Sequence, residues 1–132
     1  MMCPTRELAS QVAEEISKLA HFKKGIRELP IFGGQSYDHQ FRGLKSGPQI
    51  VIGTPGRLID HIKQGTLNLS GVKMVVLDEA DRLFALGFAD ELARITAQLP
   101  GRACVREPFG KGHRHGQEGD DQPGPLHLAQ LL

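Results

Sequence analysis

Two adjacent carboxylates close an apolar run in the second half of the chain. Asp78 and Glu79 directly follow Val75-Val76-Leu77, and a third carboxylate, Asp81, stands three residues after the first. A short β-branched and aliphatic run of this kind predicts a buried strand of a parallel sheet. Ligands of open α/β sheets bind just beyond the carboxyl ends of the strands. Two carboxylates at that edge suit a hydrated Mg²⁺, which takes oxygen ligands and keeps several of its waters.

The same carboxylates also have a purely structural interpretation. Acidic residues after a strand often form the first turn of the next helix, where negative charge meets the positive end of the helix dipole. Residues 78–81 by themselves favour neither interpretation, so the rest of the chain has to decide.

Three other short segments could bind a phosphate. Thr5 is a plausible N-cap with Arg6 in the following turn, and free backbone N–H groups at a helix start attract anions. At residues 54–57, Thr54 can cap a second helix, and Pro55 suits its first position. Gly33-Gly34 permits positive φ angles and close approach of another backbone. Each segment could equally be a well-made junction or an ordinary turn.

Apolar periodicity predicts the elements that would position these segments. Strands are expected at residues 1–4, 26–32, 49–53 and 72–77, and helices at about residues 5–21, 35–46, 55–65, 80–86 and 88–99. Alternating strands and helices predict an α/β fold with a parallel sheet flanked by helices and right-handed crossovers. The strand-to-helix junctions should then meet at one edge of the sheet.

Composition limits the functional classes. The chain has 132 residues, 39% of them hydrophobic, and a formal net charge of +1, so one modest domain is expected, without a strong global field for nucleic acid. Cys3 and Cys104 lack metal-ligand spacing and suggest a reducing compartment. No apolar run reaches membrane-spanning length, and the N-terminus does not resemble a signal peptide. A cytoplasmic protein without membrane contact is the expectation.

Residues 101–132 differ from the rest. Apolar periodicity disappears after Arg102, and glycine, proline, histidine and charged residues are mixed. His113 and His115 could suggest a metal, but they lack partners at useful spacing, so a disordered tail is predicted.

At this point the motifs, taken in order, resemble those of the DEAD-box family of ATP-dependent RNA helicases. The matching residues are Pro4-Thr5-Arg6-Glu7-Leu8-Ala9, Gly33-Gly34, Thr54-Pro55-Gly56-Arg57 and Asp78-Glu79-Ala80-Asp81. Each motif alone is weak, but four in the family's order are specific. The similarity covers residues 1–100, which implies part of the first RecA-like helicase domain.

The resemblance implies a role for each motif. Asp78 would hold Mg²⁺ through water beside the ATP phosphates, Glu79 would orient and deprotonate the attacking water, and Asp81 would couple the nucleotide site to a second helicase domain. The remaining motif residues would grip the sugar-phosphate backbone of one RNA strand, without reading its sequence. They are Pro4, Thr5, Arg6, Glu7, Gly33, Gly34, Thr54, Pro55, Gly56 and Arg57.

The sequence also departs from the family pattern. It contains no Gly-x-x-x-x-Gly-Lys-Thr/Ser loop, whose backbone N–H groups and lysine cradle phosphates. The family places that loop upstream of Met1, together with its adenine-recognising glutamine motif. The Ser-Ala-Thr motif and the second domain, with its arginine finger, are missing too. Residues 101–132 are therefore expected to be non-family sequence, from a shifted reading frame or a wrong gene boundary, with an authentic divergent tail as the alternative.

These observations predict a fragment of an ATP-dependent RNA helicase that by itself hydrolyses negligible ATP and binds RNA at best weakly. A non-catalytic, sequence-independent RNA-binding module is one alternative. A non-functional truncated product is another, because loss of a strand leaves a raw sheet edge. A metal-dependent nuclease fits less well, since the carboxylate pair lacks further ligands.

Overall fold

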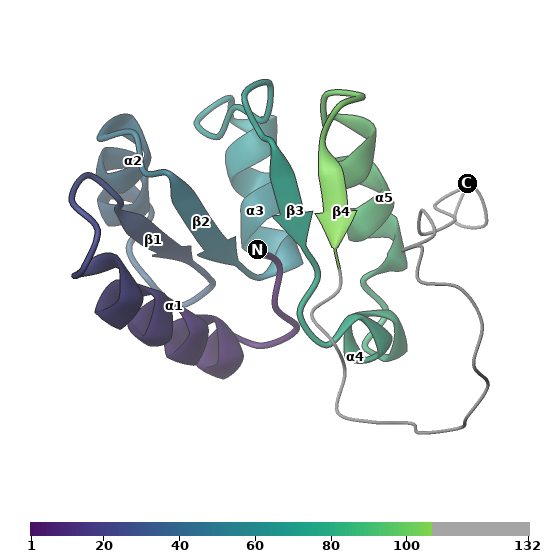
Figure 1. Ribbon diagram of the computed structural model, residues 1–132. Coiled ribbons are helices and arrows are strands. Elements are labelled where there is room, and N and C mark those ends of the chain that lie inside the picture. The colour runs from purple at the N-terminus through teal and green to yellow at the C-terminus, as the bar shows by residue number, and fades with distance from the viewer. Residues whose placement is uncertain (107–132) are drawn as a thin grey trace, which may run out of the picture.

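Strands and helices alternate along the chain, as the computed structural model describes for residues 1–106 (Figure 1). The strands are β1 (Glu28–Ile31), β2 (Ile50–Gly53), β3 (Met74–Val76) and β4 (Cys104–Arg106), and the helices are α1 (Arg6–Ala20), α2 (Tyr37–Lys45), α3 (Pro55–Lys63), α4 (Ala80–Ala85) and α5 (Ala89–Ala97). The order of elements expected from periodicity is confirmed as far as α5, whereas β4 lies in a segment for which no strand was expected. The predicted disordered tail and its histidines lie in residues 107–132, outside the described residues.

All strand pairs are parallel. β1 pairs with β2, and β3 pairs with β4. The N-terminal residues join the two pairs, because Met2 forms parallel bridges to both Gly53 and Leu77. Its N–H donates to Val76 O at 2.8 Å, and its carbonyl accepts from Asp78 N at 2.9 Å. The spatial order is therefore β1, β2, residues 1–3, β3, β4, and the predicted parallel α/β fold flanked by helices is confirmed (Figure 1).

The register aligns the ends of these strands in one row. Ile31 lies opposite Gly53, Gly53 opposite Met2, and Met2 opposite Leu77. The residues that follow them, beginning with Phe32, Thr54, Cys3 and Asp78, consequently leave the sheet at a single edge, toward which the arrowheads point in Figure 1.

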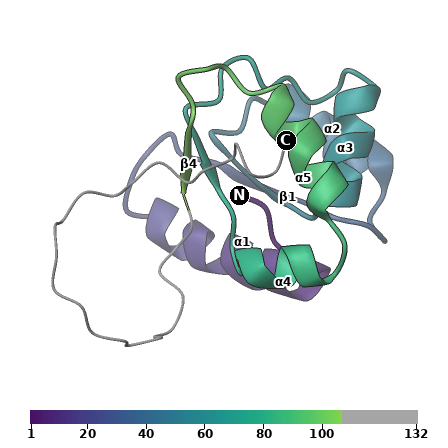
Figure 2. The ribbon, with the colours of Figure 1, turned by 90° about the vertical axis from the view of Figure 1, so that its right-hand side faces the viewer.

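The sheet has helices on both faces. α1 lies on one face, whereas α2, α3 and α5 lie on the other (Figures 1 and 2). On the α1 side, Ala9 and Ala13 are buried against Cys3 and Ile52. These alanines let the helix approach the sheet closely, and the apolar stripe predicted for α1 is what packs there.

The second face carries the larger core. Buried aliphatic side chains from the strands meet those from three helices, and this cluster contains Met2, Ile31, Leu58, Ile59, Val75, Leu77, Ala80, Leu83, Leu92 and Ile95. The burial of Val75 and Leu77 confirms that the apolar run before the carboxylates is an interior strand.

The sheet continues beyond residue 100, where we expected the helicase-like segment to end. Met74, Val75 and Val76 lie opposite Cys104, Val105 and Arg106. Leu77 N also donates to Arg106 O at 2.9 Å. The residues of β4 are exposed or half-buried, and their sequence has no strong strand pattern. They can still pair with β3, because strand pairing uses backbone N–H and C=O groups, which every non-proline residue carries.

Among the helices of residues 1–106, none is long and apolar enough to cross a membrane.

Candidate functional site

The start of α1 is built as its sequence predicts. Thr5 is in an extended conformation, and its hydroxyl accepts a hydrogen bond from Leu8 N at 3.2 Å. Arg6 and Glu7 form an ion pair at 3.1 Å, with side chains 65% and 70% exposed. A hydrogen bond from the backbone of Glu7 itself, followed by one from Arg6, lowers the pKa of Glu7. Because an exposed ion pair is worth little, Arg6 is free to exchange its partner for a phosphate.

A shallow hollow joins the start of α1 to the Gly33-Gly34 loop. Its lining residues are Arg6, Glu7, Ser10, Gln11, Phe32, Gly33, Gly34 and Gln35. Gly34 has φ +85°, and a Cβ added there would lie 3.2 Å from Arg6 Nη1. Two motifs that are separated by more than twenty residues thus share one surface, and the loop needs glycine at its second position.

The start of α3 has a different geometry. Thr54 is extended, but its side chain makes no capping hydrogen bond, so the expected cap at this residue is wrong. Pro55 does occupy the first turn and is buried. With Pro55 lacking an N–H and no side-chain cap present, the N–H groups of Gly56 and Arg57 remain for a ligand. None of residues 54–57 lines the hollow beside α1.

The carboxylates follow β3 at the same edge. Asp78 is half-buried, and its backbone N–H is held by Met2 O at 2.9 Å. Glu79 has φ 49° and ψ 55°, a left-handed conformation that it alone adopts among the non-glycine residues of the described chain. Its carboxylate contacts Arg82 Nη1 at 3.3 Å with the side chains 44% and 53% exposed. Asp81 is exposed in the first turn of α4. The structural interpretation therefore holds for Asp81, whereas Asp78 and Glu79 precede the helix.

Cys3 shares the electrostatics of this edge. Burial of the thiol, and next the negative charge of Asp78, raise the pKa of Cys3 to about 11. The thiol is fully buried and neutral at pH 7, so it fills core space and supplies no nucleophile.

The carboxylates suit a metal that is shared with phosphates rather than a protein cage. Within residues 1–106, no group of three histidine, cysteine or acidic side chains could hold a metal ion. Mg²⁺ commonly takes only one or two carboxylates and completes its shell with water and phosphate oxygens. Asp78 is compatible with that chemistry, since it follows β3 at this edge, is partly exposed and has no ion-pair partner among the described residues.

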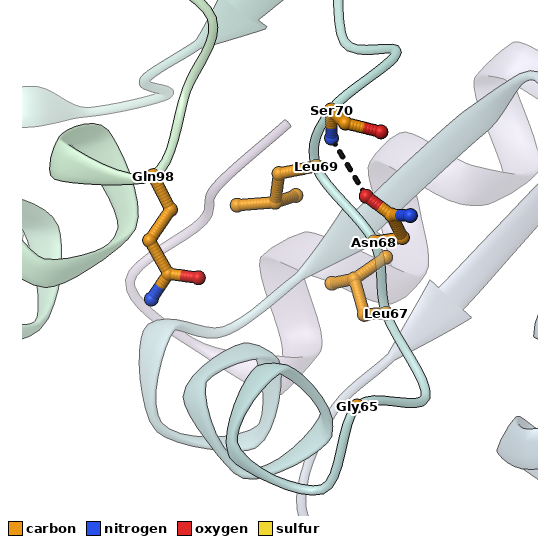
Figure 3. Close-up of a pocket in the computed structure, with 6 residues that line it drawn as sticks. All are labelled: Gly65, Leu67, Asn68, Leu69, Ser70 and Gln98. Atoms are coloured by element: carbon orange, nitrogen blue, oxygen red, sulfur yellow. Dashed lines mark hydrogen bonds between the residues drawn. The ribbon is translucent and has the colours of Figure 1, made fainter.

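A second hollow lies away from these motifs. Gly65, Leu67, Asn68, Leu69, Ser70 and Gln98 line it (Figure 3). These residues belong to the α3–β3 connector and the end of α5, at the opposite edge of the sheet (Figure 1). None of the candidate residues is part of it.

Sequence reasoning missed several residues of the first hollow. Ser10 and Gln11 follow Arg6 and Glu7 by four residues, so they stand on the same faces of α1. That spacing could have identified them once α1 was recognised. Phe32 and Gln35 flank the two glycines and gave no comparable signal.

The fold and these junctions define a class: a parallel α/β domain that presents two helix starts, a glycine loop and an acidic pair at one sheet edge. Comparison with known proteins is consistent with that class. The family model of the DEAD/DEAH box helicases matches residues 1–108. The chain therefore belongs to the DEAD/DEAH box helicase family.

Curated relatives have half of the aligned residues in common with this chain. It is 54% identical over 100 residues to the ATP-dependent RNA helicase DeaD of Buchnera aphidicola subsp. Acyrthosiphon pisum, covering 76% of this chain and 17% of the relative. Identity to the DeaD protein of Escherichia coli K12 is 50% over 100 residues, covering 76% and 16%. The chain thus spans about a sixth of the length of these relatives.

A solved structure agrees at the level of the fold. The crystal structure of a DEAD box protein from the hyperthermophile Methanococcus jannaschii superposes with a TM-score of 0.76 at 42% identity, covering 80% of this chain and 29% of that one. The family and the fold expected from the sequence motifs are both confirmed.

Proposed function

We propose that this chain carries the RNA-gripping part of an ATP-dependent RNA helicase and binds one RNA strand by its sugar-phosphate backbone. The contacts would come from three junctions at one sheet edge: residues 4–7, Gly33-Gly34 and residues 54–57. Backbone contacts carry no sequence information, so the binding is independent of sequence. Unwinding would additionally require the second helicase domain, with Asp81 as the coupling residue.

One observation carries this proposal: the hollow between α1 and the Gly33-Gly34 loop. Arg6 supplies a positive charge that only an exposed ion pair restrains, and the opposite wall has no side chain at its two glycines, between Phe32 and Gln35. A phosphate needs both a cation and room for close backbone approach. The neighbouring strand β2 leads directly into the start of α3, which has no side-chain cap and carries Arg57.

ATP and Mg²⁺ belong to the proposal for the parent enzyme. Asp78 would hold Mg²⁺ through water and Glu79 would orient the attacking water, with the metal neutralising phosphate charge. The relatives are described as ATP-dependent, which supports ATP use in the parent. The printed sequence contains no phosphate-binding Gly-x-x-x-x-Gly-Lys loop, so this chain by itself should bind nucleotide poorly. We also propose a cytoplasmic location, which the two free cysteines support.

RNA binding can be tested by fluorescence anisotropy with labelled oligouridylate and oligoadenylate. We expect the two RNAs to bind with affinities within about twofold, and the affinity to fall steeply between roughly 50 and 200 mM salt. Arg57→Ala should weaken both about equally and reduce the salt slope by about one. Asp78→Ala should leave RNA binding intact, because its role lies with the nucleotide.

Arg94→Ala is the matched control. It removes the same charge from an exposed position in the last turn of α5, near the opposite sheet edge. If Arg94→Ala weakens binding as much as Arg57→Ala, or if the wild-type chain does not bind RNA, the proposed interface is wrong.

A further inference from the structure

The polar side chains that are buried in residues 1–106 are Gln40 and His61, both 0% exposed. Gln40 is on α2 and His61 is on α3, and they meet at 2.9 Å between Oε1 and Nε2. A buried polar group is costly unless it is hydrogen-bonded, so a helix pair that only needed packing would use apolar residues here. The pair therefore calls for a reason beyond filling the core.

Gln40 holds both ends of the Gly33-Gly34 loop. Its Nε2 donates to Phe32 O at 2.9 Å and to Gln35 Oε1 at 3.0 Å. Phe32 immediately precedes the two glycines, and Gln35 immediately follows them. The side-chain amide of Gln40 thus holds the residues on either side of the two glycines.

The partners of Gln40 determine the state of His61. Because Phe32 O can only accept, the amide nitrogen of Gln40 faces the loop and its oxygen faces His61. His61 Nε2 must then donate. Burial, and next the positive charge of Arg57, lower the pKa of His61, so the ring is neutral. Its Nδ1 lies 2.8 Å from Thr66 Oγ1, whose one hydroxyl proton also has the backbone carbonyl of His61 as an acceptor at 3.0 Å. Every polar atom of the pair has a partner.

His61 connects this grip to the start of α3. Arg57 precedes His61 by one helical turn, on the same side of α3. Three hydrogen bonds and one helical turn therefore link the Gly33-Gly34 loop to Arg57. Two of the bonds run from Gln40 to the residues that flank the loop, and the third joins Gln40 to His61. This link joins two of the three segments that are assigned to RNA.

We propose that Gln40 and His61 are positioning residues, which set the Gly33-Gly34 loop against the start of α3 so that one RNA backbone can contact both. This inference rests on the proposed function and adds a requirement: the loop must be ordered before RNA arrives. If the loop became ordered only on binding, the loss of its conformational entropy would reduce the binding free energy and lower the affinity for RNA.

A role in stability alone is the competing explanation, and Tyr37 separates the two. Its ring stacks on His61 with centroids 4.3 Å apart, and its hydroxyl lies 3.1 Å from Thr66 Oγ1. Tyr37→Phe keeps the stacking and removes a hydrogen bond of the same cluster without touching the loop. It should lower the melting temperature and leave RNA affinity unchanged.

The test compares two variants with this control in the 132-residue chain. Gln40→Leu removes both the grip on the loop and the partner of His61. Gln40→Glu keeps an acceptor for His61, and its ionised carboxylate cannot donate to Phe32 O, so measurements at about pH 8, where ionisation is favoured, test release of the loop without removing the partner of His61. At a temperature where each protein is folded, both should weaken oligouridylate binding about three- to tenfold, the factor expected for ordering a loop on binding.

A readout without RNA separates this inference from the proposed function. In the Gln40 variants, the NMR order parameters of the Gly33 and Gly34 amides should fall to flexible values, below about 0.6, while Tyr37→Phe retains the wild-type values. If the wild-type chain binds no RNA, the proposed function fails, and these order parameters alone decide whether the loop is held. Unchanged order parameters in both Gln40 variants would overturn the positioning role.

Discussion

Glu79 has a backbone conformation that non-glycine residues rarely adopt. Its φ of 49° costs about 1–2 kcal/mol, because Cβ approaches the following carbonyl oxygen. This conformation belongs to the three-residue connection between β3 and α4, and it leaves Asp78 and Glu79 at the sheet edge. Strain of this kind persists where the surrounding structure enforces it and often marks functional sites. The Glu79 side chain makes no capping hydrogen bond, so its conformation is compatible with the proposed role of the carboxylate pair at the nucleotide.

The two cysteines should differ in reactivity. Cys3 is fully buried with a pKa raised to about 11, whereas Cys104 is exposed on β4. Since the thiolate is the reactive species, iodoacetamide at pH 8 should modify Cys104 and spare Cys3 until the protein is denatured. Peptide mass spectrometry measures each site. Equal modification of both in the native protein would contradict the burial of Cys3.

Stability should fall as the pH drops below the ordinary histidine range. The folded protein lowers the pKa of His61, so the unfolded chain, with a histidine pKa near 6.5, binds more protons between the two values. The contribution of His61 is fully present above about pH 6.5 and is lost as the pH falls toward the folded pKa. Urea midpoints at about pH 8 and 5.5 measure this loss.

His61→Asn removes the titrating ring and should flatten that pH dependence, whereas His39→Asn, at an exposed position, should preserve it. Parallel pH profiles of the wild type and His61→Asn would assign the effect to other groups.

At the scale of elements, the sheet edge depends on close contact between β2 and its neighbours. A Cβ at Gly53 would lie 2.6 Å from Ile31 O and 2.8 Å from the Leu58 side chain. Gly53 is therefore required by packing, and its position directly before residues 54–57 sets where α3 begins.

Gly53→Ala should destabilise the protein by about 1–3 kcal/mol, because the new methyl group overpacks the β1–β2–α3 contact. Gly71→Ala is the control, since nothing lies within 4 Å of its added Cβ. It should change the unfolding free energy by less than about 0.5 kcal/mol. Chemical denaturation measures both, and equal effects would contradict the close approach at Gly53.

At the scale of the whole molecule, helices cover the two faces of the sheet unequally. Met74 and Cys104 lie opposite one another and are both exposed, on the face that α1 covers elsewhere.

The chain spans about a sixth of the length of the DeaD relatives, and its sequence contains the acidic pair without the phosphate-binding loop. Because phosphoryl transfer depends on positioning and charge neutralisation of ATP, we expect this chain to hold ATP too incompletely for hydrolysis.

The 132-residue chain should show no RNA-stimulated ATP hydrolysis above that of its Glu79→Gln variant. A coupled phosphate-release assay with Mg²⁺ and oligouridylate measures this, and a full-length DeaD relative serves as the positive control. RNA-stimulated hydrolysis that Glu79→Gln abolishes would show that the chain holds a working nucleotide site.

Local sequence determined much of this protein. Apolar periodicity was sufficient for the order of strands and helices as far as α5. Residue chemistry was sufficient for Thr5 as a cap and Pro55 at a helix start. The motifs at residues 78–81 and 54–57 indicated the family. These features depend on residues that are neighbours in the chain, so their spacing alone carries the information.

The tertiary structure decided what joins residues that are distant in the sequence. Residues 1–3 pair between β2 and β3, β4 extends the sheet past residue 100, and Gln40 meets His61 across two helices. No local pattern encodes these contacts, because backbone pairing accepts many sequences and a buried polar pair looks like surface residues until both helices are in place. The sequence therefore determined which residues could carry chemistry, and the packing of the sheet decided which of them meet at one edge.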